Sequence, residues 1–153
     1  MAKRVLSIEN PGIRRGDNSE RPGLPIMTID SQTPRLILMV DDDVLIAMTS
    51  VDMLEELGHK VIEAHSGREA LEVLGKAANG GDRIDLLITD FSMPGMNGAE
   101  LAIQARQLVP GLPILLATGY TELPQGMEID VGRLGKPYSQ EDLASGIAKA
   151  ISG

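Results

Sequence analysis

Residues 85–98 carry the pattern that decides the fold, with the sequence DLLITDFSMPGMNG. An apolar run of strand length, Leu86-Leu87-Ile88, leads to the carboxylate of Asp90, and a segment rich in proline, glycine and asparagine follows directly. A short apolar run that ends in such a turn is typical of a buried strand. We therefore expect Asp90 at the exposed carboxyl end of a strand, the position at which open parallel α/β sheets bind ligands.

The length and composition exclude several classes of protein. The chain has 153 residues, enough for one domain with a core and a tail. Its formal net charge of −8 argues against a nucleic-acid module, because such modules carry a basic face. The absence of cysteine excludes disulfides and thiolate sites and fits a reducing compartment. No apolar run approaches the roughly 18 residues of a membrane span. We expect a cytoplasmic protein that binds neither nucleic acid nor membrane.

Residues 1–34 differ in composition from the rest of the chain. Prolines and glycines are closely spaced there, and no apolar period is sustained. This segment has five basic and four acidic residues, so its charge is +1 and residues 35–153 carry −9. We predict a disordered N-terminal extension at residues 1–34, followed by one domain at residues 35–152.

From Arg35 onward, strand-length apolar runs alternate with segments of helical period. The expected strands are residues 36–40, 60–64, 84–89, 113–117 and 131–134. The expected helices are residues 44–57, 67–78, 98–108 and 139–151, with Asn97 and Ser139 as N-caps. A fifth helix between the last two strands should be short and irregular, because Pro124 and Gly126 interrupt it.

This alternation predicts an α/β domain with one doubly wound parallel sheet, because parallel strands need crossover connections. Helices on both faces would explain why the strands are almost entirely apolar. The positions expected to face the core are Val44, Met48, Val51 and Leu54 in the first helix and Leu143, Ile147 and Ile151 in the last.

Three adjacent carboxylates, Asp41-Asp42-Asp43, follow the first expected strand. They repel one another, and solvent exposure, a raised pKa or a bound hard cation would relieve that repulsion. Asp43 is also a candidate N-cap of the next helix, with its neighbours solvated. The ends of the first and third strands should be neighbours at the switch point of the sheet. Asp41, Asp42 and Asp90 could therefore converge on an oxygen-rich site that suits Mg²⁺.

Two further groups follow the fourth and fifth strands at the same edge. Thr118 precedes Gly119, and Lys136 precedes Pro137. Alone, such a threonine is usually a strand former, and such a lysine is a solvated charge. A following proline, however, restricts the backbone of the lysine. A hydroxyl, an ammonium, a carboxylate and a divalent cation around one point are the groups that bind and accept a phosphoryl group.

The full set of motifs resembles the receiver domain of two-component response regulators over about residues 35–152. The residues that carry the resemblance are Asp41-Asp42, Asp90 with Met93-Pro94-Gly95-Met96-Asn97-Gly98 behind it, Thr118, and Lys136-Pro137. The resemblance implies a CheY-like, flavodoxin-like fold with five helices and the strand order 2-1-3-4-5.

The same resemblance implies roles for individual residues. Asp90 would accept a phosphoryl group from the phosphohistidine of a sensor histidine kinase or a histidine phosphotransfer protein. Thr118 and Lys136 would contact the phosphoryl oxygens, and the Lys136-Pro137 peptide would be cis. The implied Mg²⁺ ligands are Asp41, Asp42, Asp90 and the backbone carbonyl of Ser92, with Asp41 the more indirect of the pair.

Ala117-Thr118-Gly119-Tyr120 is similar to the motif of a stand-alone, single-domain subgroup of receivers, with Leu116 where phenylalanine would stand. This similarity implies signalling through protein contacts with a downstream protein. Most receivers have an aromatic residue three positions before the lysine, where this chain has Arg133. Tyr120 is a candidate substitute in the switch.

Two alternatives remain open from the sequence. Asp41-Asp42-Asp43 also fits the start of a haloacid-dehalogenase-like phosphatase with Asp41 as the nucleophile, although the chain has little room for the cap and later ligands of such an enzyme. A receiver-fold adaptor that is never phosphorylated is the second alternative. We expect no enzyme beyond self-catalysed phosphorylation and dephosphorylation. His59 and His65 lack the spacing of metal ligands.

Overall fold

A computed structural model describes residues 33–119 and 131–152 of the chain, and all of these except Thr33 lie in the unit Pro34–Gly153. Its strands are β2 (Leu36–Val40), β3 (Lys60–Ala64), β4 (Leu86–Asp90), β5 (Ile114–Thr118) and β6 (Gly132–Gly135). Its helices are α2 (Val44–Glu56), α3 (Gly67–Ala78), α4 (Gly98–Leu108) and α5 (Gln140–Ser152). The helix predicted between the last two strands falls in residues 120–130, which lie outside the described residues. Nearly all of the predicted N-terminal extension lies outside them as well.

The five strands form one sheet in the order β3-β2-β4-β5-β6, and every neighbouring pair is parallel. Numbered along the chain, this is the order 2-1-3-4-5, so the predicted doubly wound, flavodoxin-like fold is confirmed. The order changes direction between β2 and β4. The carboxyl ends of these two strands therefore lie side by side at the switch point, where such sheets bind ligands.

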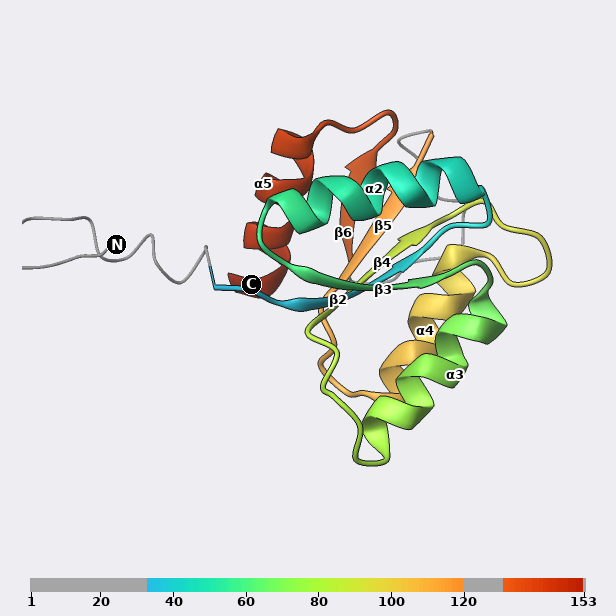
Figure 1. Cartoon of the computed structure of the whole chain (residues 1–153). Coiled ribbons are helices and arrows are strands. Elements are labelled where there is room, and N and C mark those ends of the chain that lie inside the picture. The colour runs from blue at the N-terminus through green and yellow to red at the C-terminus, as the bar shows by residue number, and fades with distance from the viewer. Residues whose placement is uncertain (1–32, 120–130, 153) are drawn as a thin grey trace, which may run out of the picture. The chain divides into compact units, whose positions relative to one another are not determined.

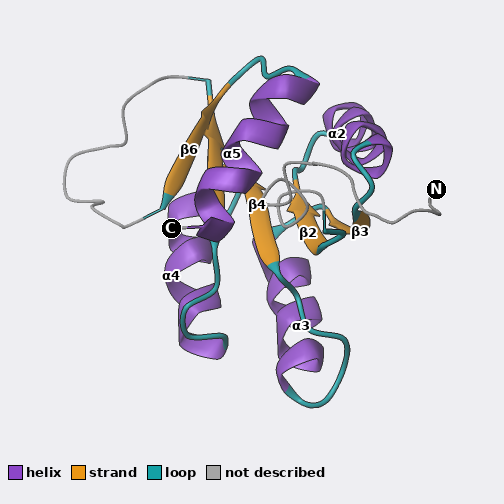
Figure 2. Cartoon of the chain, turned by 90° about the vertical axis from the view of Figure 1, so that its left-hand side faces the viewer, coloured by secondary structure: helices purple, strands orange, loops and turns teal. Residues whose placement is uncertain are grey.

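Helices cover both faces of the sheet, with α2 and α5 on one face and α3 and α4 on the other (Figures 1 and 2). Successive residues of β2 alternate between the two layers. Leu38 and Val40 pack with α3 and α4, whereas Ile37 and Met39 pack with α2 and α5. All four side chains are fully buried. A strand that is apolar at every position is thus explained by cover on both sides.

The observed elements begin or end one or two residues away from several predicted bounds. The largest difference is at β4, which begins at Leu86 rather than at residue 84, because the pairing of β2 with β4 begins at Ile37 and Leu86. One residue earlier, the carboxylate of Asp85 accepts a hydrogen bond from the backbone N–H of Leu36 at 2.9 Å. The Asp85 N–H also donates to the Leu36 carbonyl at 2.8 Å, so a side-chain oxygen replaces one backbone acceptor where the pairing begins.

The predicted core face of α2 is wrong for two of its four residues. The fully buried positions of this helix are Ala47, Ser50 and Leu54, while Val44 and Met48 are each 52% exposed. The helix has apolar residues on nearly every side, so the spacing did not distinguish the core face. In α5, the predicted Leu143 and Ile147 are buried.

The caps predicted at the helix starts are confirmed. Asn97 and Glu100 form a reciprocal capping box at the start of α4. At α5, the Ser139 hydroxyl accepts from the Asp142 N–H, and the Asp142 carboxylate accepts from the Ser139 N–H.

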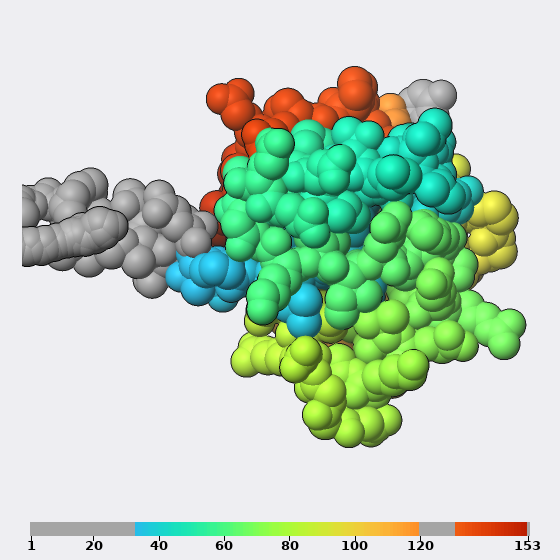
Figure 3. Space-filling view, in the orientation of Figure 1, coloured from blue at the N-terminus to red at the C-terminus, as the bar shows by residue number. Residues whose placement is uncertain are grey.

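The surface in Figure 3 is formed mostly by side chains of α2, β3 and α3. No helix in residues 33–119 or 131–152 is long and apolar enough to cross a membrane.

Candidate functional site

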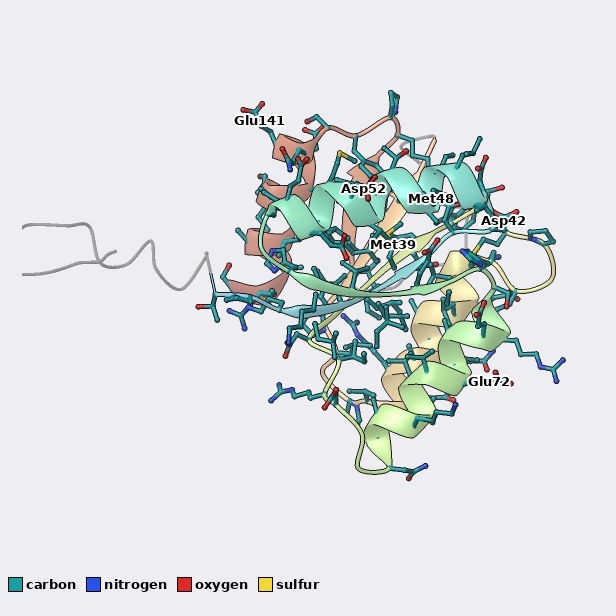
Figure 4. The ribbon with its side chains drawn as sticks, in the orientation of Figure 1. Met39, Asp42, Met48, Asp52, Glu72 and Glu141 are labelled. Atoms are coloured by element: carbon teal, nitrogen blue, oxygen red, sulfur yellow. The ribbon has the colours of Figure 1, made fainter. Side chains whose placement is uncertain are left out.

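Three carboxylates meet where β2 and β4 end. Val40 pairs with Thr89, so the next residues, Asp41 and Asp90, leave the sheet beside each other. Carboxylate oxygens of Asp41, Asp42 and Asp90 all lie within 4.8 Å of one another. The side chains of Asp41 and Asp90 are buried, and Asp42 is exposed at the end of the sheet where α2 begins (Figure 4). The predicted convergence of the two acidic segments is therefore observed.

The third carboxylate of the first cluster has a different task. Asp43 is the N-cap of α2, and its Oδ1 accepts from the backbone N–H groups of Leu45 and Ile46 at 3.0 and 3.2 Å. This cap matches the structural role considered for Asp43 in the sequence. The Asp43 N–H in turn donates to Oδ1 of Asp41 at 2.9 Å, which fixes the direction of the Asp41 carboxylate.

The other oxygen of Asp41 is the unusual atom of the site. Asp41 is 1% exposed, and its Oδ2 has no hydrogen-bond donor among the described residues. Burial raises the pKa of the Asp41 carboxyl, the N–H of Asp43 opposes that shift, and the negative charge of Asp90 adds to it. A buried carboxylate oxygen without a donor favours a positive ligand, because a buried charge is costly unless it is compensated.

Lys136 supplies the positive charge. Its Nζ lies 2.6 Å from Oδ1 of Asp90 and 3.6 Å from Oδ2 of Asp41. Burial acts to lower the pKa of Lys136, but the hydrogen bond and the charge of Asp90 raise it. The Lys136-Pro137 peptide is cis, as predicted, and the Lys136 N–H donates to the carbonyl of Thr118 at 2.9 Å. One ammonium therefore faces two buried carboxylates at the carboxyl edge of the sheet.

The turn after Asp90 is tightly built. The N–H of Phe91 donates to the Ala117 carbonyl at 2.7 Å, and the N–H of Gly98 donates to the Phe91 carbonyl at 2.8 Å. A β-carbon at Gly98 would lie 2.8 Å from Cα of Phe91 and would also clash with the carbonyl of Asp90. Only glycine fits where α4 begins so close to the end of β4. Ser92 lies exposed between these contacts, two residues after Asp90.

The remaining predicted residues fall into three groups. Thr118 is buried at the end of β5, at the same edge as Asp90. Tyr120 lies outside the described residues, and Arg133 is exposed on β6. The histidines are not part of the site. His59 accepts from the Arg35 N–H at 3.1 Å, and His65 pairs with Glu63.

One contact near the site was missed in the sequence. The hydroxyl groups of Ser50 and Tyr138 lie 2.7 Å apart and join α2 to the segment just after Lys136. The sequence does contain a signal for this contact. Ser50 stands three residues after Ala47 and four before Leu54, on the buried face of α2. A polar residue in an apolar stripe indicates a buried hydrogen bond.

The donor set fits a hard divalent cation. Three carboxylates surround one point, one of their buried oxygens has no donor among the described residues, and a single ammonium leaves the group with excess negative charge. Oxygen-only coordination with open positions for water suits Mg²⁺. Receiver domains generally bind Mg²⁺ at an acidic pocket of this kind.

The fold and the site together define an α/β domain with a carboxylate-rich pocket and a paired lysine at its switch point. The chain belongs to the response regulator receiver domain family, because the model of that family matches residues 37–148. Receiver domains are phosphoacceptor signalling modules of two-component systems and are not classical enzymes. They interact with histidine kinases and phosphotransfer proteins. Membership of this family goes against the phosphatase alternative.

Curated relatives differ widely in length. The chain is 33% identical over 119 residues to the response regulator receiver protein CpdR of Brucella abortus, covering 75% of this chain and 95% of CpdR. It is 31% identical over 119 residues to the sensor kinase CckA of the same organism, covering 75% of this chain but 12% of CckA. The match to the regulator GlrR of Escherichia coli likewise covers 27% of GlrR. The chain therefore spans only a small part of several relatives.

Solved structures share the fold. A receiver domain protein from Clostridium thermocellum superposes with a TM-score of 0.68 and 28% identity, covering 77% of this chain and 94% of the other. The response regulator TrrA from Thermotoga maritima, in complex with Mg²⁺ and BeF, has a TM-score of 0.66 and 29% identity, covering 76% and 98%.

Proposed function

We propose that Asp90 accepts a phosphoryl group from the phosphohistidine of a sensor histidine kinase or a histidine phosphotransfer protein. The observation that carries this proposal is the contact of 2.6 Å between Nζ of Lys136 and Oδ1 of Asp90, beside the Asp41 oxygen without a donor. Asp90 is buried, yet it ends a strand at the edge where ligands bind. It thus combines a fixed direction with access from the carboxyl edge.

In the proposed step, an oxygen of the Asp90 carboxylate attacks the phosphorus of the phosphohistidine. The new O–P bond forms as the P–N bond breaks, and the imidazole leaves with the electron pair of that bond. Lys136 stabilises negative charge on the phosphoryl oxygens, and the Thr118 hydroxyl donates to one of them. The product is an acyl phosphate on the protein, which water can later hydrolyse.

Asp41, Asp42, Asp90 and the backbone carbonyl of Ser92 would hold Mg²⁺ in this proposal. When bound, Mg²⁺ would neutralise charge on the carboxylates and on the phosphoryl oxygens. Asp41 has the strongest support among these ligands, because its Oδ2 is buried without a donor among the described residues. The proposal also agrees with the complex of TrrA with Mg²⁺ and BeF.

The protein donor would dock beside the acceptor, on the first turns of α2. Val44, Leu45, Ile46 and Met48 are large apolar side chains that are between 38% and 74% exposed. Grouped exposed apolar residues mark interaction surfaces. Phosphorylation would then signal to a downstream protein through protein contacts in the cytoplasm, without nucleic acid, since the described domain lies in the chain region of charge −9.

Intact-mass analysis after incubation with acetyl phosphate and Mg²⁺ tests this proposal against the adaptor alternative. Wild type should gain the mass of one phosphoryl group, and Asp90→Ala should gain none. Asp52→Ala is the matched control, because Asp52 is an exposed carboxylate on α2 (Figure 4). No added mass on wild type, or equal addition to Asp90→Ala, would refute the proposal.

A further inference from the structure

The segment that follows Lys136 is fastened to α2 by side-chain hydrogen bonds across long sequence separations. The hydroxyl of Tyr138 lies 2.7 Å from the hydroxyl of Ser50, 88 residues away. Two residues later, Nε2 of Gln140 donates to the Met53 carbonyl at 3.1 Å and to Oε1 of Glu56 at 3.0 Å. Of the residues at these contacts, Ser50 is the most deeply buried, at 1% exposed. Of the two connections to α2, the Ser50-Tyr138 hydrogen bond is therefore the one shielded from water.

Lys136 lies between two fixed points of the chain. On its N-terminal side, the backbone N–H of Lys136 donates a hydrogen bond to the Thr118 carbonyl at the end of β5. On its C-terminal side, Pro137 restricts the backbone, and the Tyr138 hydroxyl is hydrogen-bonded to Ser50. Because the lysine side chain has several rotatable bonds, its ammonium stays in one place only if the backbone at its root is held.

The tyrosine is also within the electrostatic environment of the acceptor. Burial raises the pKa of the Tyr138 hydroxyl, the hydrogen bond with Ser50 opposes that shift, and the charges of Asp41, Lys136 and Asp90 act on it as well. The hydroxyl therefore stays protonated at neutral pH and can take part in the bond. The ring of Tyr138 packs against the apolar core between the sheet, α2 and α5.

We propose that Ser50 and Tyr138 form a positioning pair that holds Lys136 at the acceptor carboxylate. The pair fixes the chain two residues beyond the lysine against α2, which keeps Nζ of Lys136 at 2.6 Å from Asp90. Within the described residues, neither hydroxyl forms a hydrogen bond with Asp41, Asp42 or Asp90. They act through Lys136. The effect on phosphorylation rests on the function proposed for Asp90, whereas the effect on the position of Lys136 does not.

Four variants test the pair. Tyr138→Phe and Ser50→Ala each remove one hydroxyl with almost no change of shape, and the double variant removes both. Ser50→Thr keeps a hydroxyl and should restore the wild-type behaviour. The first measurement is the rate of phosphorylation by acetyl phosphate at saturating Mg²⁺, per folded molecule, with urea denaturation to give the folded fraction.

Each single variant should be about fivefold slower than wild type, the order expected from one hydrogen bond. The double variant should be no slower than the singles, because the two hydroxyls act as one unit. Variants that unfold at lower urea concentration but keep the wild-type rate would show a purely structural role and overturn the proposal. Additive losses in the double variant would overturn it as well.

The second measurement does not depend on phosphorylation. The proton–nitrogen spectrum of the lysine ammonium groups shows those that a hydrogen bond protects from exchange with water. We expect a Lys136 signal in wild type and Ser50→Thr, and its loss in Tyr138→Phe and Ser50→Ala. If wild type takes no phosphoryl group, the function proposed for Asp90 fails. The spectrum still tests whether Ser50 and Tyr138 hold the Lys136 ammonium in place. An unchanged Lys136 signal in Tyr138→Phe would overturn the positioning role.

Discussion

Nζ of Lys136 lies 2.6 Å from the Asp90 carboxylate and 3.6 Å from the buried Oδ2 of Asp41, so one ammonium faces two buried acids. With the nearby Asp42, three carboxylates surround one ammonium among the described residues. Burial of an excess charge costs stability. The site therefore favours a bound cation at a cost to the stability of the free protein.

Asp41→Asn should increase stability in the absence of divalent cations. Burial raises the pKa of the Asp41 carboxyl in the folded state. A raised carboxyl pKa gives stability that is present below the unfolded pKa and lost as pH rises through the folded pKa. At neutral pH the variant should gain about 1 kcal/mol in the free energy of unfolding.

Urea denaturation at neutral pH and at acid pH checks this prediction. The gain should shrink at acid pH, where Asp41 is protonated in both states. Asp52→Asn is the control, since Asp52 is exposed on α2. Added Mg²⁺ should stabilise wild type more than Asp41→Asn. A variant that is less stable than wild type at neutral pH would show that Asp41 is not a buried excess charge.

Lys136→Gln should slow phosphorylation by acetyl phosphate roughly 100- to 1000-fold, the effect of losing one preorganised group that stabilises charge at a transition state. The same variant should bind Mg²⁺ more tightly, because a competing cation has been removed from the carboxylates. Rates at saturating Mg²⁺ and a Mg²⁺ titration separate the two effects. Lys60→Gln, at an exposed lysine on β3, should change neither. Weaker Mg²⁺ binding by Lys136→Gln would contradict the charge argument.

Leu45→Ser should weaken transfer from a protein donor and leave the reaction with acetyl phosphate unchanged. Leu45 is 74% exposed in the first turn of α2, beside the site. Loss of one apolar contact in a protein interface costs about tenfold when the contact is central. Transfer from a purified phosphorylated histidine kinase that serves wild type gives the measurement. Ile103→Ser on α4 is the control, at a site 47% exposed. Equal transfer to both variants would exclude α2 as the docking surface.

His59, which lies outside the carboxylate site, should make the free energy of unfolding depend on pH. Its Nδ1 accepts from the Arg35 N–H, and burial, with the charge of Arg35, lowers its pKa. The unfolded chain then binds the proton more readily, so stability is full above the unfolded pKa, about 6.5, and is lost as pH falls toward the folded pKa.

Replacement of the histidine should flatten that dependence. Urea midpoints of His59→Gln should vary less between neutral and mildly acid pH than those of wild type. His65→Gln is the control, because the His65 side chain is 41% exposed. The same steep decline in His59→Gln as in wild type would show that another group is responsible.

Much of the fold could be predicted because its signals are local. The predicted strands that end shortly before Asp41, Asp90 and Lys136 fix which residues reach one edge of the sheet, and parallel connectivity then brings them together. Asn97 and Ser139 marked helix starts through the same local chemistry. The meeting of Asp90, the acidic cluster and Lys136 at one edge therefore follows from strand ends and turns.

Other features depend on contacts that the sequence pattern does not contain. The core face of α2 was ambiguous, because Val44 and Met48 are as apolar as the residues that are buried. The bond between Ser50 and Tyr138 joins positions 88 residues apart and needs the packing of two helices around the sheet. The hydrogen bond from the Leu36 N–H to the Asp85 carboxylate likewise depends on the register of β2 against β4.

The most direct test of the central claim locates the phosphoryl group on the chain. Borohydride reduces an aspartyl phosphate to homoserine, and peptide mass spectrometry then identifies the position. After incubation with acetyl phosphate and Mg²⁺, homoserine should be found at position 90 and should disappear when Mg²⁺ is removed. Homoserine at position 41 or 42 instead, or at no position in a folded protein, would contradict the assignment of Asp90 as the acceptor.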